Sequence, residues 1–458
     1  MELLYISLAI LVLVLHVLSV IFFKRAFYLY LFLFVPCYGL FLDLCSRITP
    51  LAANTVITAT KDYVWIFILL GFFVHQLIKP YTCRFPTAMA MWLLLYILYG
   101  LSTISMSMSN IGFTGLALGV RNAFMYIPAA FIAACLISNG KDILALIYRF
   151  RFMMIVIGLY TIIQITFGIE SSFNVLRDRA DLKNAVTSTF LSYIELSYFA
   201  CMCFALLIAG FKWLRGKALT VVGLGLAVFC IVMSQSRTGL IVLALLLIPF
   251  AFKKSRLFAG TLFIASAVIM LLVISNPELF YAHRLYKDAF ATSRIIDWMS
   301  VFPWFFEHPI FGYGLGSFGP AAFKTVQMGW ASASKAYYMD SFFLTTLLNT
   351  GLTGLCLFLL LLVNIFGYIR KTGKNASVRE TKDLISGIKI ILLVNLFYSL
   401  FFNMIDGFPG SLYFWFFAGV VCAIGSRKQD VAARCKDGSV VAVPSQVVGD
   451  VNVIYPAV

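Results

Sequence analysis

The chain of 458 residues is 62% hydrophobic, only 12% charged, and carries a formal net charge of +16. Soluble domains carry about 25% charged residues, and a protein core alone cannot enclose this much apolar surface, so a soluble globular protein is excluded. The basic residues lie in short clusters between apolar runs, a pattern that indicates anionic lipid rather than nucleic acid as the partner.

Apolar runs long enough to cross a bilayer, about 20 residues each, recur along the whole chain. We therefore predict an all-α, polytopic integral membrane protein with about 12–13 transmembrane helices. The first run should be a retained helix, because it lacks the basic start and small-residue cleavage site of a signal peptide. The thirteen predicted spans are 3–23, 27–44, 62–78, 87–105, 121–138, 152–168, 190–211, 218–235, 238–252, 257–275, 340–369, 385–405 and 411–425.

The basic residues are unequally divided between alternate connections. One set holds 21 Lys and Arg against three acids, at Lys24/Arg25, Lys79/Arg84, 141–151, 212–217, 253–256, 370–389 and Arg427/Lys428. The short connections of the other set hold seven basic residues: Arg47, Lys61, Arg121, Arg177, Arg179, Lys183 and Arg237. Because basic connections stay in the cytoplasm, we predict an inner-membrane protein with a non-cytoplasmic N-terminus and a cytoplasmic C-terminus.

One predicted connection is much larger than the others. Residues 276–339 separate the helices of 1–275 from those of 340–425, and a cytoplasmic, flexible tail is expected at 426–458. The large loop is too rich in aromatic residues to be a disordered linker. We expect it to contain an amphipathic helix at about 290–307 that lies on the membrane surface and roofs a periplasmic cavity.

Arg237 lies between two apolar spans that have almost no loop between them, in Ser234-Gln-Ser-Arg-Thr-Gly239. A charge beside hydrocarbon is costly unless it has a partner or an anionic ligand. Ser236 or Thr238 is expected to cap the following helix, whose N-terminus would add positive potential. The alternative is an interfacial arginine that snorkels to water.

Further arginines fall on the same side of the predicted membrane. Each alone fits a structural role, but several together indicate an anion site, because guanidinium groups bind phosphate oxygens bidentately. They are Arg121, Arg177, Arg179, Arg284 and Arg294.

Two acids are candidate functional groups. Asp340 begins the apolar run Ser341–Leu360, where it fits either a helix cap or a general base at the roof of the cavity. Glu195 is an acid inside a predicted span, and an intramembrane carboxylate is a functional hypothesis by default.

The remaining motifs mainly exclude kinds of site and classes of protein. Gly312-Tyr-Gly-Leu-Gly316 lacks the Lys-Ser/Thr of a phosphate-binding loop, so a tight turn is favoured. No His or Cys spacing is typical of a metal site, and no Asp-x-Asp pair occurs, so neither a metal nor a cofactor is expected. We find no internal repeat and no pair of Gly- or Pro-broken helices, which argues against a secondary transporter.

The order of four motifs resembles a known family. Ser234-Gln-Ser-Arg-Thr-Gly-Leu240 opens a span, and Ser293-Arg294-x-x-x-Trp298 follows it in the large loop. Next come His308-Pro-Ile-Phe-Gly-Tyr-Gly-Leu-Gly-Ser-Phe318 and Asp340-Ser-Phe-Phe-Leu-x-x-Leu-Leu-Asn-Thr-Gly-Leu-Thr-Gly354. Together they resemble the superfamily of O-antigen ligases and Wzy-type polysaccharide polymerases.

The resemblance implies a metal-independent glycosyltransferase whose donor is a polyprenyl-diphosphate-linked glycan. Its expected catalytic residues are Asp340, Arg294 and Arg237, and its expected diphosphate- and glycan-binding residues are Arg121, Arg179, Arg284 and Glu195. Ligases of the family typically carry His-Asn where this chain has Asp340-Ser341, which favours a polymerase of repeat units for O-antigen, capsule or exopolysaccharide. The expected partners are the lipid-linked glycan, membrane lipids and other polysaccharide-assembly proteins, but no nucleic acid.

Three alternatives remain open from the sequence. A ligase would transfer a finished glycan to a lipid or protein acceptor. A flippase or other transporter would move the lipid-linked glycan, and a membrane scaffold would have no chemistry of its own.

Overall fold

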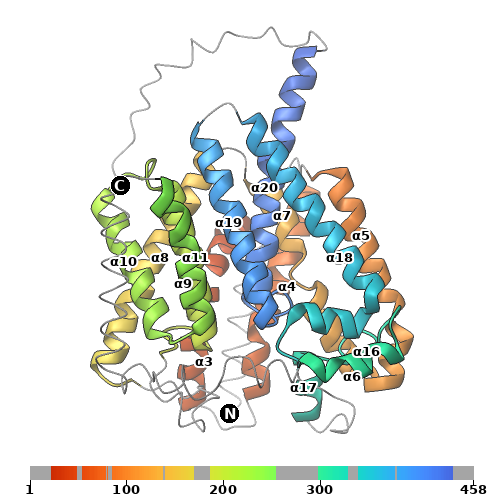
Figure 1. Ribbon diagram of the computed structural model, residues 1–458. Helices are drawn as coiled ribbons and strands as arrows, with labels where there is room; N and C mark the ends of the chain where they lie inside the picture. Colours follow the sequence, from red (N-terminus) through yellow and green to blue (C-terminus); the bar gives the residue numbers. More distant parts are fainter. Residues whose placement is uncertain are drawn as a thin grey trace.

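The computed structural model describes residues 22–48, 54–78, 80, 85–137, 140–169, 186–253, 298–327, 339–376 and 379–436, and these residues contain helices and no strand (Figure 1). Seven of the helices are long and apolar enough to cross a membrane. The predicted span 257–275 lies outside the described residues, as does 3–23 except for its last two residues, Phe22 and Phe23. The other eleven spans fall on helical residues, but the connection predicted at 106–120 is wrong, because it lies within a helix at Ile104–Phe124. The all-α, polytopic prediction is confirmed.

The helices of the first half begin with one continuous rod that contains a π-helical turn. Its parts are α2 (Phe23–Leu29), η1 (Tyr30–Phe34) and α3 (Val35–Ile48). Then follow α4 (Asn54–Ile78), α5 (Thr87–Ser102), α6 (Ile104–Phe124), α7 (Pro128–Leu136) and α8 (Gly140–Thr166).

The helices of the second half include two short ones outside the spans, α16 (Val301–Glu307) and α17 (Pro320–Gln327). The others are α9 (Tyr193–Gly210), α10 (Lys217–Met233), α11 (Arg237–Lys253), α18 (Phe342–Asn375), α19 (Arg379–Phe401) and α20 (Gly410–Lys436). α20 therefore continues past the predicted end of its span at 425. Of the predicted amphipathic helix 290–307, the described part begins at 298 and is helical at Val301–Glu307.

The centre of the bundle is formed by α7, α9 and α20. α7, most of α9 and the part of α20 up to Gly425 are apolar on all sides, and nearly all of their described side chains are buried, as expected of a helix enclosed by others. α5 and α10 instead expose leucine and valine side chains along one face, which suits contact with lipid.

The bundle has two chemically different ends. Arg151 donates to the carbonyl of Arg215 at 2.7 Å, and the Trp213 indole donates to Asp383 at 3.3 Å. Three connections predicted to share the cytoplasmic side therefore meet at one end, here called the basic end. α6, α16 and α17 gather at the opposite end, here called the site end (Figure 1).

The helix α18 is broken at Gly351, and the loop between α16 and α17 fills the break. Gly351 has φ 65°, a left-handed conformation that favours glycine. The freed carbonyls of Leu348 and Asn349 accept from the amides of Tyr313 and Gly314, at 2.9 and 2.8 Å, and the Leu352 amide donates to Pro309 at 2.8 Å. The glycine motif 312–316 is therefore a turn, as predicted, and it is shaped to satisfy a broken helix.

The helix α6 is broken in the same way at Gly112, with φ 70°. The two breaks share one sequence pattern, Asn-x-Gly-x-Thr-Gly-Leu, at 110–116 and at 349–355. Both asparagines bind the same loop: Asn110 donates to the carbonyl of Tyr313 at 2.8 Å, and Asn349 accepts from the amide of Phe318 at 2.8 Å. The expectation of no internal repeat and no pair of glycine-broken helices is therefore wrong, because the repeated pattern is short and 239 positions apart (349 minus 110).

Asn349→Ala is expected to lower the stability of the protein by about 1–3 kcal/mol, because it leaves the buried Phe318 amide without its acceptor. Asn364→Ala is the matched control, since Asn364 is a half-buried residue of the same helix that bonds only one turn back, to Leu360. Thermal unfolding of the two purified variants in detergent measures the difference. Equal unfolding temperatures would show that the loop is not held by Asn349.

Candidate functional site

Arg121 and Asp62 form an ion pair at the site end. An Nη of Arg121 on α6 lies 2.5 Å from a carboxylate oxygen of Asp62 on α4, and both side chains keep some solvent access, 25% and 15% respectively. The hydroxyl of Tyr126 donates to the other oxygen of Asp62 at 3.1 Å. The Nε of Arg121 is buried without a hydrogen-bond partner. The guanidinium is therefore oriented by Asp62 and keeps a donor for a further acceptor.

Lys61 lies beside this pair between two aromatic rings. Its Nζ is 5.4 Å from the ring centroid of Tyr38 on α3 and 5.4 Å from that of Phe408 in the turn before α20. A cation over aromatic faces is stabilised by the ring quadrupole, more strongly where water is excluded. The charged groups within electrostatic range of Lys61 are Asp62, Arg121, Lys324 and Glu195.

Lys324 on α17 adds a third cation. Burial lowers the pKa of its ammonium group, repulsion by Arg121 lowers it further, and Asp62 acts in the opposite direction. The three cations Lys61, Arg121 and Lys324 therefore surround Asp62 closely enough to repel one another. An anion bound among them would relieve that repulsion.

Glu195 lies in the first turn of α9 and has two roles. It accepts from the amide of Leu191 at 3.3 Å, while Ser192 accepts from the amide of Glu195 at 3.2 Å, which forms a reciprocal capping box. The Glu195 carboxylate also lies close enough to the Lys61 ammonium group for the two charges to attract each other. The structure thus brings Glu195 and Arg121, both singled out from the sequence, to one cluster around Lys61 and Asp62, here called the cation cluster together with Lys324.

Arg237 is the first residue of α11, and the predicted cap is present. Ser236 accepts from the amide of Gly239 at 3.2 Å, so Ser236 is the capping residue of the two expected. Gly239 packs so closely against α9 that a Cβ there would lie 2.9 Å from the Cβ of Ser197. Arg237 therefore starts its helix beside the same turn of α9 that carries Glu195.

Of the two roles expected for Asp340, helix cap or general base, the cap is wrong. The N-cap of α18 is Ser341, and Asp340 precedes it. Met339, the preceding residue, accepts through its carbonyl from the amide of Asn403. The side-chain oxygen of Asn403 is buried without a hydrogen-bond partner. Asp340 is therefore not needed for capping, and it lies beside the turn that connects α19 to α20.

That turn, Phe402–Pro409, contains an acid that the sequence reading did not single out. Burial raises the pKa of Asp406 to about 7, so its proton is exchanged near neutrality. Two residues later, Phe408 contacts Lys61, while Asn403 contacts Met339. The turn therefore connects the Asp340 region with the cation cluster.

The remaining predicted residues Arg179, Arg284 and Arg294 lie outside the described residues, as does Arg177. Within the described ranges, no group of three or more His, Cys, Asp and Glu side chains could hold a metal ion. Lys61 and Asp62 were not predicted as site residues. Their position could have indicated such a role, because both charges lie at the edge of an otherwise apolar span. Lys324 carried no such signal, because nothing local indicates that α17 lies against α6.

The ion pair predicts a coupled effect on stability. Asp62→Ala alone is expected to destabilise the protein by about 1–3 kcal/mol, because the Arg121 guanidinium and the Tyr126 hydroxyl lose their acceptor. Adding Arg121→Ala should restore part of the loss, because it removes the unpaired charge. Unfolding temperatures of both single variants and the double variant measure the coupling, and strictly additive losses would exclude it.

A family model described as O-antigen ligase matches residues 222–359. The match runs from α10 into α18 and therefore includes Arg237, Lys324, Asp340 and both the loop and the helix break at Gly351. No curated protein matches the chain.

Proposed function

We propose that this chain, which belongs to the O-antigen ligase and Wzy-type polymerase superfamily through residues 222–359, polymerises lipid-linked oligosaccharide repeat units. The donor is a glycan on a polyprenyl diphosphate, and the reaction takes place at the non-cytoplasmic face of the bacterial inner membrane. No metal takes part. The observation that carries the proposal is the gathering of Lys61, Arg121 and Lys324 at the end of the bundle opposite the basic end.

The cation cluster suits the leaving group. When the bond between the sugar C1 and the phosphate oxygen breaks, the electron pair stays with the diphosphate, and negative charge grows there. Fixed cations in a site with little water stabilise that charge strongly. Arg121 would bind the diphosphate with the solvent-accessible part of its guanidinium and Lys61 with its ammonium. Arg237, Arg179, Arg284 and Arg294 remain proposed contributors from the sequence.

The acceptor sugar hydroxyl must lose a proton as its oxygen bonds to C1. Asp340 is the base expected from the family's motif order. Asp406 is a second candidate, because its turn contacts both the Asp340 region and Lys61. A carboxyl that exchanges its proton near neutrality is well matched to general base catalysis.

A ligase is the second candidate function. The family description, O-antigen ligase, favours it, whereas the Asp340-Ser341 pair in place of the ligases' typical His-Asn favours the polymerase. The third candidate is a flippase. The lack of glycine-broken helices no longer argues against it, because α6 and α18 are both broken at a glycine. The packing of the loop residues 309–314 into the Gly351 break nevertheless closes that break with backbone hydrogen bonds.

The deciding experiment is turnover by the purified protein with a defined polyprenyl-diphosphate oligosaccharide in the presence of a chelator. A ladder of lengthened lipid-linked glycans is the expected product. Transfer only to an added lipid or protein acceptor would identify a ligase, and loss of product with chelator would contradict the metal-free mechanism. In cells, an Arg237→Ala variant should accumulate unpolymerised repeats outside the membrane, whereas accumulation inside would indicate a flippase.

Lys61→Met is expected to weaken binding of the lipid diphosphate by about tenfold or more, since a charge-assisted contact contributes roughly 1.5–3 kcal/mol. Arg121→Met should have a similar effect. Lys371→Met is the matched control, because Lys371 is exposed at the basic end. Binding of a sugar-free polyprenyl diphosphate to the folded variants measures this, and equal affinity for all three would remove the cluster from the donor site.

The two candidate bases predict different pH profiles. If Asp406 accepts the proton, transfer should rise as pH increases through about 7, because its carboxylate form appears over that range. Asp406→Asn should abolish this rise, whereas Asp340→Asn should lower the rate and keep the rise. The opposite pattern would assign the proton transfer to Asp340.

A further inference from the structure

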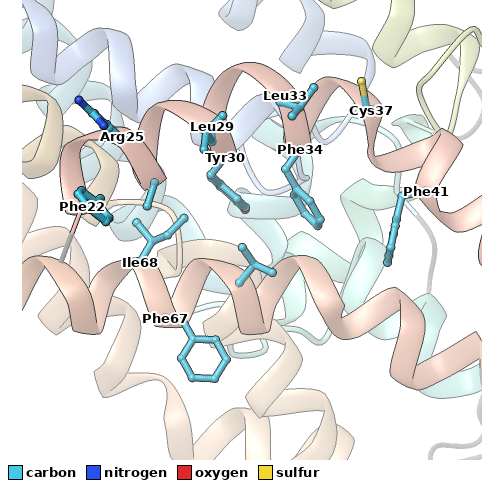
Figure 2. A pocket seen from close by; sticks show the side chains of 12 residues that line it. Phe22, Arg25, Leu29, Tyr30, Leu33, Phe34, Cys37, Phe41, Phe67 and Ile68 are labelled. Carbon is cyan, nitrogen blue, oxygen red and sulfur yellow. The ribbon is translucent and has the colours of Figure 1, made fainter. Parts of the chain in front are cut away.

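A groove lies between the rod α2–η1–α3 and the helix α4 (Figure 2). Its volume is about 500 Å³, within the range of roughly 300–1,000 Å³ of small-molecule sites. Figure 2 shows Tyr30, Phe34 and Phe41 of the rod between the two helices, with Ile68 of α4 opposite them. Apart from Arg25, the Tyr30 hydroxyl and the Cys37 thiol, the lining is hydrocarbon. Such a groove fits an apolar chain and not a sugar.

One end of the groove leads to the cation cluster. Val64 and Ile68 line the groove, and Lys61 lies on the same face of α4, one turn closer to the site end. Tyr30, a lining residue, donates its hydroxyl to the carbonyl of Lys61 at 3.4 Å. A phosphate beyond the Val64 end of the groove would therefore lie about one turn of α4 from Lys61.

The π-helical turn Tyr30–Phe34 forms part of the wall. Such turns are rare and occur frequently at functional sites. Tyr30 and Phe34, four residues apart in this wall, stack with ring centroids 5.5 Å apart and planes 18° apart. The planar alkene units of an isoprenoid pack flat against such rings, which increases their dispersion contact relative to a narrow, straight acyl chain.

We propose that this groove binds the isoprenoid chain of a lipid diphosphate whose headgroup is held at Lys61 and Arg121. The inference rests on the proposed function for the identity of the headgroup, and it adds where the lipid lies. A section of the chain occupies the groove, and the remainder extends into the bilayer.

The test uses a sugar-free polyprenyl diphosphate that carries a photoreactive diazirine on its chain, added to the full-length protein in lipid nanodiscs. Peptides of 22–48 and 54–78 are expected to carry the label. Val64→Trp fills the groove and should reduce this labelling about fivefold or more, while Val363→Trp, at an exposed valine of α18, should leave it unchanged. Ala26→Trp, at a second lining residue, replaces Val64→Trp if that variant does not fold.

A phosphatidylglycerol with the same diazirine on an acyl chain is the competing probe. Equal labelling of the groove by this probe, or labelling of other helices by the isoprenoid with none in the groove, would overturn the inference. Groove labelling without glycan transfer in the turnover assay would sink the proposed function and leave the groove assignment standing. Glycan transfer that is unaffected by Val64→Trp, with no groove labelling, would contradict the groove assignment and leave the proposed function standing.

Discussion

Charge held beside hydrocarbon is the constraint on which the rest of this structure depends. Lys61, Asp62 and Arg121 are carried by helices whose other side chains are largely apolar, and each charge is stabilised locally. Asp62 accepts from Arg121 and Tyr126, and Lys61 is placed between the rings of Tyr38 and Phe408. Separating one of these charges from its partner would leave an uncompensated charge beside hydrocarbon. The helices that carry Lys61, Asp62 and Arg121 must therefore be held in fixed positions relative to one another.

Two glycine-broken helices supply part of that rigidity. The breaks at Gly112 and Gly351 have nearly the same conformation, with φ of 70° and 65°, and the asparagine two residues before each break binds the loop between α16 and α17. The loop leads directly into α17, which carries Lys324 to the cation cluster. The backbone amides of Gly312, Tyr313 and Gly314 in the glycine-rich motif donate to protein carbonyls. The motif thereby helps to position a cation that is proposed to bind phosphate.

The turn Phe402–Pro409 and the groove along α4 meet at the same cluster from different sides. The turn carries Asp406 and contacts both Lys61 and the residue before Asp340. The groove provides an apolar path whose α4 wall ends at Val64, one turn from Lys61. Hydrocarbon chain, diphosphate and acceptor hydroxyl are thus proposed to occupy three adjoining environments, each with the matching polarity.

The sequence by itself determined the all-α membrane class, most of the helix positions and the division of connections between two ends. These properties follow from run length and composition, which are local. It also indicated Arg121, Glu195 and Arg237, because a charge near a span is conspicuous in one dimension. Only the tertiary structure decided that Arg121 pairs with Asp62, that Lys324 joins them from the large loop, and that Asp340 does not cap α18. Those contacts join residues that are far apart along the chain and depend on how the loop fits into two broken helices, which no local pattern of hydrophobicity or charge encodes.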